Sequence, residues 1–398
     1  MTRRLQNLRV KNFRQLKDLS IESLGDVNLI VGGNNSGKST FLEAIRLLAG
    51  RGAPSLIEEL LASHGEYQFG PSPSVDVDAP GGRALANLFS GRRFPFEDDE
   101  PISIGEMHGG LGLQLEHVAL EEFFEERDVN GETLTTRRLR RVPKDSASSD
   151  SEFVEAFEIQ STDDTGLFPS AARSIAVPLT DFFSSRRALA RARYEDAALP
   201  VPVSYVGSQA GGRDSLAELW DEVVLTEGER YALEALQLIE PKTSGLAFVL
   251  QAKLRWLKGV DRPHEDRVAV VKLLGVPSPI PLRAMGDGMT RVLHLVLSAL
   301  RAKGGFLLVD EFENGLHYSI QQQIWEILFF LAKLNDVQIF ATTHSSDCVR
   351  AFSKVAVGSE QLGQLIRFER DLDADETVTS IVEEHSLDDL LTSGIEVR

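Results

Sequence analysis

The chain has 398 residues, 42% of them hydrophobic, and a formal net charge of −18 that arises from 60 acidic and 42 basic side chains. This length accommodates roughly two or three domains, and the acidic balance disfavours nucleic-acid binding by the whole surface, because nucleic acid is itself a polyanion. Cys348 is the only cysteine, which excludes an intramolecular disulfide and a multi-cysteine zinc site. No apolar run is long enough to span a membrane and no apolar signal core follows Met1, so the sequence predicts a cytoplasmic protein without a membrane partner.

The chain begins with three short predicted strands and a glycine-rich loop. Alternating or continuous apolar residues predict strands at residues 5–13, 17–21 and 27–31. The third strand enters a sequence that fits the pattern G-x-x-x-x-G-K-[ST], and a helical pattern leaves it, which is the setting that this phosphate-binding motif requires. The residues of the motif are Gly32, Gly33, Asn34, Asn35, Ser36, Gly37, Lys38, Ser39 and Thr40.

This loop predicts a site for the phosphates of a nucleotide together with Mg²⁺. Gly32 and Gly37 allow the backbone conformations that a tight loop needs, so that N–H groups can approach anionic oxygens. The helix that begins near Lys38 adds its positive N-terminal end. We expect Lys38 to reach the β and γ phosphates and the Ser39 hydroxyl to be a ligand of Mg²⁺.

The rest of the first region, residues 1–95, contains two short helical patterns at 56–62 and 83–89, separated by an exposed loop rich in proline and glycine. Residues 96–210 follow with period-2 segments, which predict an antiparallel β layer that widens the first lobe. The predicted strands of this layer lie at 111–118, 133–142, 153–159, 174–179 and 201–206.

Two arginine clusters lie in this β layer. The first contains Arg137, Arg138, Arg140 and Arg141, and the second contains Arg186, Arg187, Arg191 and Arg193. Such clusters could contact a nucleic-acid backbone or an acidic partner. Alternatively, their side chains could lie on both faces of a strand and pair with local carboxylates, which is the interpretation we favour.

Residues 211–265 change to a helical pattern. Apolar stripes predict helices at 215–224 and 227–239, joined at Thr226, and Pro241 ends the second helix. No long heptad array is present, so the pattern predicts a compact helical insertion and not an extended coiled coil. This insertion is a natural place for a partner surface.

Residues 266–398 contain the groups that complement the phosphate-binding loop. After a predicted strand at 268–274, the turn of Gly286, Asp287 and Gly288 opens a long helix, and a glycine-rich helix N-terminus is a second anion site. The apolar run 305–309 then ends at Asp310 and Glu311. In P-loop ATPases an aspartate at such a strand end orders Mg²⁺ and its waters, and the following glutamate orients or deprotonates the attacking water. A helix at 320–331 and a strand at 337–341 lead to His344.

Together these motifs resemble ABC-type AAA ATPases of the RecF/OLD-like group, which includes stand-alone ATP-binding proteins of bacterial anti-phage and restriction loci. The motifs are Asn12-Phe13-Arg14, Gly32 to Thr40, Gly286 to Arg291, Asp310 to His317, and Thr343-His344-Ser345. The resemblance implies an α/β fold, an ABC-type P-loop ATPase head with an antiparallel β layer and a helical insertion. Residues 266–398 would then form the C-terminal ATPase lobe.

The resemblance also implies roles for single residues. Arg14 would lie beside the nucleotide phosphates, and Gly286 to Gly288 would cap the γ phosphate of the nucleotide held by a second subunit. His344 would sense the γ phosphate, and with Glu311 and Lys38 it completes the expected catalytic set. Ser39 and Asp310 are the expected metal ligands. The group also carries a glutamine that touches the metal and the attacking water, for which Gln68 and Gln114 are the two candidates and neither has a decisive spacing.

The sequence departs from the resemblance at two points. ABC ATPases carry an L-S-G-G-Q signature at the turn that caps the γ phosphate, and Met285 occupies the place of its serine. The turn after Met285 must therefore act through backbone N–H groups. OLD proteins continue into a metal-dependent nuclease domain, whereas the sequence after His344 predicts only strands near 362–368 and 377–382 and a short helix, too little for a nuclease.

These observations predict an ATP-driven dimeric switch whose two heads enclose two ATP·Mg²⁺ and control a separately encoded effector in anti-phage defence. Two alternatives remain open: a RecF-like DNA-repair ATPase that clamps DNA through its local arginine clusters, and a nucleotide-bound scaffold with little turnover. A GTPase is disfavoured, because the guanine-reading N-K-x-D pattern is absent from the sequence.

Overall fold

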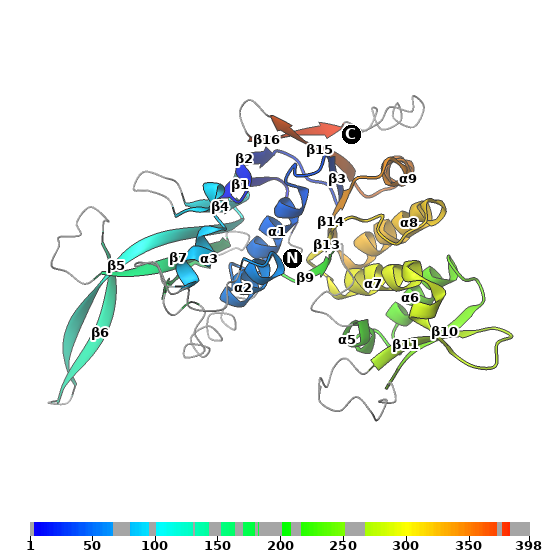
Figure 1. Ribbon diagram of the computed structural model, residues 1–398, viewed down its shortest axis with the longest axis horizontal. Helices are drawn as coiled ribbons and strands as arrows, with labels where there is room; N and C mark the ends of the chain where they lie inside the picture. The colour runs from blue at the N-terminus through cyan, green and yellow to red at the C-terminus, as the bar shows by residue number, and fades with distance from the viewer. Residues whose placement is uncertain are drawn as a thin grey trace.

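A computed structural model of the chain describes residues 4–66, 80–94, 101–129, 132–142, 153–163, 170–179, 182, 201–207, 216–250, 267–371 and 376–382. Figure 1 shows a central sheet with helices on one side and a helix followed by a second sheet on the other. A long hairpin of the second sheet projects away from the rest of the molecule (Figure 1).

The central sheet is built from segments that lie far apart in the chain: β3 (Val27–Gly32), β9 (Val203–Val206), β13 (Phe306–Val309), β14 (Gln338–Thr343), β15 (Gly363–Asp371) and β16 (Glu376–Val382). Its strand order is β16-β15-β3-β14-β13-β9, and all neighbours pair in parallel except β16 with β15. The carboxyl ends of β3, β14 and β13 therefore meet at one edge of the sheet, where ligands bind in open α/β sheets.

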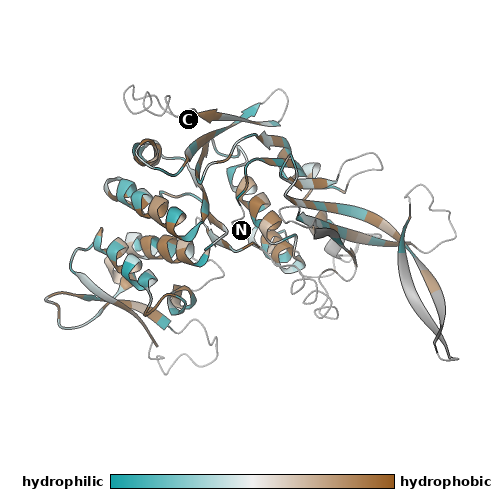
Figure 2. Ribbon diagram, turned by 180° about the vertical axis from the view of Figure 1, so that it is seen from behind, coloured by the Kyte–Doolittle hydropathy of each residue, from teal (hydrophilic) through white to brown (hydrophobic). Residues whose placement is uncertain are grey.

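Both faces of the central sheet are covered, which explains why its inner strands β3, β13 and β14 are buried along almost their whole length. Leu29 and Val31 of β3 pack against the helices of one face, and Ile30 between them packs against the other. The helices of the first face are α5 (Leu216–Asp221), α6 (Glu227–Gln237), α7 (Asp287–Arg301), α8 (Tyr318–Asn335) and α9 (Ser346–Val357). In Figure 2 these helices carry hydrophilic residues on their outer sides.

The other face of the central sheet packs on α1 (Lys38–Ala49). The ring of Phe41 in α1 makes edge contacts with Phe340 of β14 and Phe368 of β15, at centroid distances of 6.3 and 5.4 Å. Beyond α1 lies the antiparallel layer, in the order β2-β1-β4-β5-β7-β8 with β6 paired to β5. Its strands are β1 (Leu8–Phe13), β2 (Leu16–Ile21), β4 (Ile102–Gly105), β5 (Leu111–Val129), β6 (Glu132–Val142), β7 (Phe153–Asp163) and β8 (Ser170–Pro178), and the helical pieces beside it are α2 (Pro54–Ser63), α3 (Pro80–Ala86) and η1 (Ser90–Arg92).

One predicted strand belongs to the other sheet. Alternation placed residues 201–206 in the antiparallel layer, but β9 is the edge strand of the central sheet and pairs in parallel with β13. In β9, Ser204 and Val206 are buried and Val203 and Tyr205 are partly buried, so the alternation reflects that one face is covered more fully than the other. It carries no information on which sheet provides the cover, and the placement of 201–206 was wrong for that reason.

The insertion contains the two expected helices and one unexpected strand. Thr226 caps α6, and its Oγ1 accepts a hydrogen bond from the N–H of Gly228 at 3.1 Å. The chain then forms β10 (Thr243–Leu250), which pairs with β11 (Arg267–Leu273) and through it with β12 (Ile280–Pro281), before the 3-10 turn η4 (Leu282–Met285). The apolar run at the end of β10 does not alternate, which is why the sequence pattern did not reveal a strand.

The predicted α/β fold class with an antiparallel β layer is confirmed. None of the helices that the structure describes combines the length and the apolar character needed to cross a bilayer.

Candidate nucleotide-binding site

The phosphate-binding motif forms a tight loop between β3 and α1. Gly37 has φ +97°, and a Cβ atom there would lie 2.7 Å from Cδ2 of Leu16, so a side chain is excluded both by conformation and by space. The Nζ atom of Lys38 donates to the carbonyl oxygens of Gly32 and Gly33, at 2.8 and 2.7 Å. The ammonium group is therefore held across the mouth of the loop.

The environment of Lys38 lowers the pKa of its ammonium group from 10.5 to about 8. Burial is the main cause, because removal from water disfavours the charged form. The carboxylates of Asp310, Glu313 and Glu311 act in the opposite direction and favour the charged form. A bound polyanion would act in the same direction as these carboxylates and raise the pKa of Lys38 again.

Asp310 lies at the end of β13, directly opposite the loop. Its two carboxylate oxygens each accept from the hydroxyl of Ser39 at 3.0 Å, and Oδ1 also accepts from the hydroxyl of Thr342 at 2.6 Å. A hydroxyl beside a carboxylate is an oxygen donor set that Mg²⁺ accepts together with phosphate oxygens and water, so Ser39 and Asp310 fit the ion. Within the described residues no three His, Cys, Asp or Glu side chains are grouped to hold a metal, so this pair needs oxygens of the nucleotide to complete a coordination shell.

Glu311 adopts a left-handed backbone conformation with φ +49°. Its N–H donates to Oγ1 of Thr342 at 2.9 Å, and its carbonyl oxygen accepts from the guanidinium of Arg291 at 2.9 Å. The amide of Asn314 donates to its Oε2 at 2.5 Å. A non-glycine residue in this region is strained, and such strain is typical of functional sites whose surroundings fix one conformation.

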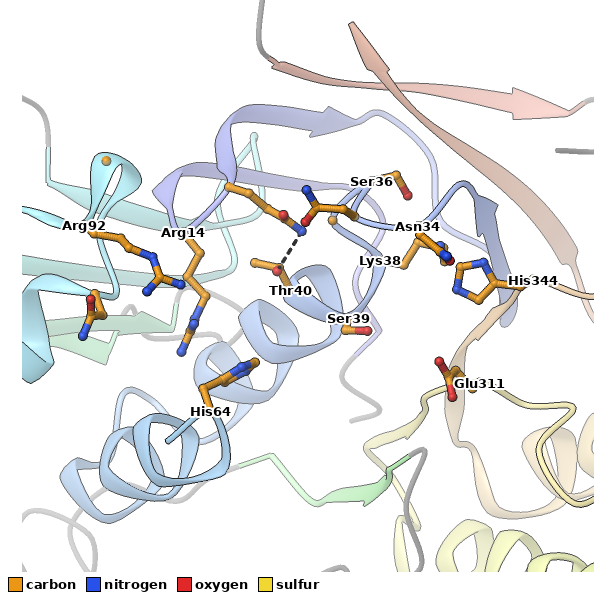
Figure 3. A pocket seen from close by; sticks show the side chains of 15 residues that line it. Arg14, Asn34, Ser36, Lys38, Ser39, Thr40, His64, Arg92, Glu311 and His344 are labelled. Carbon is orange, nitrogen blue, oxygen red and sulfur yellow. Dashed lines mark hydrogen bonds between the residues drawn. The ribbon is translucent and has the colours of Figure 1, made fainter. Parts of the chain in front are cut away.

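His344 follows the end of β14 and lies beside Glu311 in the view of Figure 3. The carboxylate of Glu313 fixes this segment, because it accepts from the hydroxyl of Thr343 at 2.7 Å and from the N–H of His344 at 2.8 Å. The imidazole itself is exposed and lines the cavity in front of the loop.

These groups surround one cavity of about 840 Å³ (Figure 3). Glu311 and His344 lie at one end of it, the loop with Thr40 lies in the middle, and Arg14 and Arg92 lie at the other end (Figure 3). The volume lies within the range of about 300–1,000 Å³ that is usual for small-molecule sites. The cavity is longer than the phosphate-binding loop that forms its centre.

Arg14 lines the cavity but is bound to two carboxylates. Its guanidinium donates to Glu66 at 3.2 and 2.9 Å, and its Nε lies 3.4 Å from Oε2 of Glu43. Oε1 of Glu43 in turn lies 2.5 Å from Nε2 of His64. This hydrogen bond raises the pKa of the His64 imidazole, against the opposing effect of burial.

The other candidate residues lie away from this cavity. Gly286, Asp287 and Gly288 stand at the start of α7, where the first two are exposed and none lines the cavity. Gln114 lies in β5 and lines a different hollow on the antiparallel layer. Gln68 lies outside the described residues.

The side chains of the first arginine cluster that the structure describes form ion pairs with glutamates. Arg140 pairs with Glu121 at 2.6 Å, and Arg141 pairs with Glu158 at 3.1 Å and with Glu116. These contacts agree with pairing between strands. The side chains of Arg137 and Arg138 and the whole second cluster, Arg186 to Arg193, lie outside what the structure describes.

Several residues of the site were missed by the sequence analysis. Thr342, Arg291 and Glu313 make hydrogen bonds that hold Asp310, Glu311 and His344 at one end of the cavity. Each of them lies inside or next to a motif that the sequence analysis identified, and this proximity was the signal that could have found them. Gln15, whose Nε2 lies 3.2 Å from Oγ1 of Thr40, directly follows the Asn12-Phe13-Arg14 corner. The residues His64, Asn87 and Arg92 also line the cavity, and no motif marks them.

Comparison with known proteins bears on both halves of the site. Residues 4–77 match the family described as AAA ATPase domain, and residues 277–347 match the family described as AAA domain, putative AbiEii toxin, type IV TA system. An ATP/GTP phosphatase of Helicobacter pylori is 21% identical over 357 residues, which cover 88% of each chain. The first match contains the phosphate-binding loop and the second contains Asp310, Glu311 and His344.

The chain is an ATPase with AAA-type sequences at both halves of the site, which fits the resemblance to the RecF/OLD-like group. The DNA replication and repair protein RecF of Cellvibrio japonicus is 46% identical to this ATPase over 66 residues, which cover 16% of this chain and 18% of RecF. The structure of an SMC head bound to the C-winged helix domain of ScpA is 13% identical with a TM-score of 0.47, over 97% of this chain and 100% of that chain.

In this ATPase the geometry can position a triphosphate and stabilise its charge without covalent chemistry by the protein. Lys38 and the other residues of the loop line the middle of the cavity, and Glu311 lines one end of it (Figure 3). Phosphoryl transfer is catalysed mainly by such positioning and electrostatic stabilisation.

Proposed function

We propose that this ATPase is a dimeric switch, in which two copies enclose two molecules of ATP with Mg²⁺ and thereby control a separately encoded effector in the cytoplasm. The observation that carries the proposal is the position of the second glycine-rich turn. Gly286 and Asp287 are exposed at the N-terminus of α7 and do not line the cavity of their own chain. A second copy can bring this turn to the open side of the cavity, and its N–H groups would then meet the γ phosphate.

Each residue of the proposed reaction has a defined part. Lys38 binds the β and γ phosphates, and Ser39 and Asp310 hold Mg²⁺, which would neutralise charge on the phosphates. Glu311 orients the attacking water and accepts its proton, for which Asn314 and Thr342 hold it in place. His344 contacts the γ phosphate, and its loop is coupled through Glu313 to the segment that carries Glu311.

The turn after Glu311 gives a physical route from ATP to dimer contact. Gly315 follows Glu311 by four residues and packs on the start of α7, where a Cβ atom at Gly288 would lie 2.9 Å from the carbonyl oxygen of Gly315. The two segments are therefore in direct contact, and we propose that a shift of one is passed to the other. Loss of the γ phosphate at Glu311 would displace the proposed dimer surface at Gly288.

We also propose that the effector acts in anti-phage defence, and similarity to a known family supports this role. One matching family is described as a putative toxin of a type IV toxin–antitoxin system, which supports an ATPase that works with a second protein. A DNA-clamping ATPase is the second candidate, favoured by the local similarity to RecF. Salt-dependent binding of duplex DNA, weakened by Arg140→Ala, would favour the clamp.

The switch is tested with Glu311→Gln. Removal of the proton acceptor should slow hydrolysis by about 100-fold or more while ATP binding persists, so the variant should accumulate as an ATP-bound dimer. Light scattering after gel filtration, with and without ATP and Mg²⁺, measures the mass. Asp287→Arg in the same background is the matched control, because it places a bulky cation in the proposed interface and should return the protein to a monomer. If Glu311→Gln stays monomeric with ATP bound, the dimer mechanism is wrong.

A further inference from the structure

The end of the cavity opposite Glu311 has no role in the hydrolytic chemistry described above. We propose that Asn87 and Arg92 form the subsite for the nucleobase and that this subsite selects adenine. The inference rests on the proposed function, since it takes the triphosphate to lie at Lys38 with its γ phosphate toward Glu311.

The direction of the nucleotide follows from the order of groups along the cavity. Glu311 and His344 mark the γ-phosphate end, and the loop leads away from them to Thr40 (Figure 3). A triphosphate bound in this order places its α phosphate near Thr40, and its nucleoside must continue toward Arg92 (Figure 3). The part of the cavity beyond Thr40 is therefore where a base would lie.

Arg92 offers a flat cationic surface to that part of the cavity. Its side chain is 69% exposed, and its Nη2 lies 3.3 Å from Oε1 of Glu66, which is only 8% exposed. Glu66 is fixed in turn by Arg14 at 2.9 Å. A planar guanidinium held from one edge leaves its face free to stack on an aromatic base, an interaction that a lysine cannot reproduce.

Asn87 offers the pattern that reads the base. It lines the cavity, and its carboxamide makes no hydrogen bond to another residue in the described part of the chain. A carboxamide presents one donor beside one acceptor, which matches the N7 acceptor and N6 amino donor of adenine. Guanine presents two acceptors, N7 and O6, along the same edge and would leave the carboxamide oxygen unpaired.

The segment that carries both residues is fixed before any ligand binds. The N–H of Arg14 donates to the carbonyl of Leu88 at 2.8 Å. Ser90 donates through its N–H to Oδ1 of Asn12 at 3.2 Å and through its hydroxyl to the carbonyl of Arg14 at 2.8 Å. The segment is thus bound to the corner between β1 and β2, next to the phosphate-binding loop. A subsite on such a support loses little conformational freedom on binding.

The test separates the base from the phosphates. Dissociation constants are measured for MgATP, MgGTP and magnesium tripolyphosphate, which has the phosphates and no base, on wild type, Asn87→Ala, Arg92→Ala and Arg92→Lys. We expect wild type to bind ATP more tightly than GTP and tripolyphosphate. Asn87→Ala should weaken ATP by about tenfold and remove the preference over GTP, and both Arg92 variants should weaken ATP and GTP alike. Tripolyphosphate should bind all variants equally.

Arg93→Ala is the matched control, because Arg93 is an exposed neighbour that does not line the cavity. Arg92→Ala keeps the experiment decisive if Asn87→Ala misfolds. The side chain of Arg92 is exposed, and its removal leaves Glu66 paired with Arg14, so this variant should fold. If wild type binds tripolyphosphate as tightly as ATP, the base subsite is wrong and the proposed function stands. The same holds if the variants weaken the binding of ATP and of tripolyphosphate equally. If wild type binds neither ATP nor tripolyphosphate, the proposed function itself fails and the subsite with it.

Discussion

The two ends of the cavity are built in different ways. At the catalytic end, three neighbouring strands of one sheet deliver the phosphate-binding loop, Asp310 with Glu311, and His344 to a common edge. At the opposite end, Arg14, His64 and Arg92 come from three separate turns, and two buried carboxylates join them. The first end depends on sheet register and backbone geometry, whereas the second depends on side-chain ion pairs. Changes at the catalytic end should therefore affect binding and turnover strongly, and changes at the opposite end should act more weakly.

The largest effect is expected for Lys38→Ala. Its ammonium group is the cation nearest the centre of the loop, and a charge-assisted contact to phosphate in a buried site is strong. We expect ATP affinity to fall by about 100-fold or more, measured by titration calorimetry with MgATP. Lys17→Ala, in an exposed part of β2, serves as the control. An unchanged affinity would mean that the triphosphate does not bind at this loop.

Thr342→Val should reduce turnover more than binding. The hydroxyl of Thr342 donates to Asp310 and accepts from the N–H of Glu311, so its loss leaves both carboxylates less well positioned. Valine keeps the shape and removes only these bonds. We expect kcat to fall by about tenfold with a smaller change in KM, measured by phosphate release. Thr379→Val, in β16, removes a hydroxyl contact to the carbonyl of Ser20 that does not line the cavity, and it should have no effect.

The pKa of about 8 for Lys38 predicts that ATP binding weakens in alkaline solution. Below that pH the free protein already carries the ammonium charge that phosphate requires. Above it, binding must take up a proton, because bound phosphate raises the pKa again. Affinity should fall by about tenfold at most for each pH unit above 8, measured from pH 7 to pH 9. Lys38→Arg should flatten the dependence, since guanidinium stays charged; a slope that persists in this variant would exclude Lys38 as its source.

The smallest effect is expected for His64→Gln at the opposite end. The hydrogen bond to Glu43 raises the pKa of His64 above its ordinary value of 6.5. The stabilisation is therefore complete below pH 6.5 and is lost as the pH rises through the raised pKa. Because the imidazole is half-exposed, we expect the variant to lose less than about 1 kcal/mol, and only at acidic pH. Urea unfolding at pH 5.5 and pH 9 measures the difference; an equal loss at both would point to packing as the cause.

The same contrast explains what could be predicted from the sequence. The loop, Asp310 with Glu311, and His344 lie in short motifs because each must follow directly on a strand end, so local spacing encodes them. His64, Asn87 and Arg92 gain their places only through contacts with residues distant in the chain, such as Glu66 and Asn12. Local patterns carry no trace of such contacts, just as the alternation at 201–206 could not tell one sheet from the other.

The order of strands in the central sheet has a consequence for synthesis on the ribosome. The strand β3 leaves the ribosome long before both of its partners, β14 and β15, which begin at residues 338 and 363. Until those partners emerge, the loop has no rigid strand behind it and no acidic group opposite. A nascent fragment that ends before residue 338 lacks both partners and therefore cannot form the site, and a premature stop ahead of that residue yields an inert chain and not a partly active one.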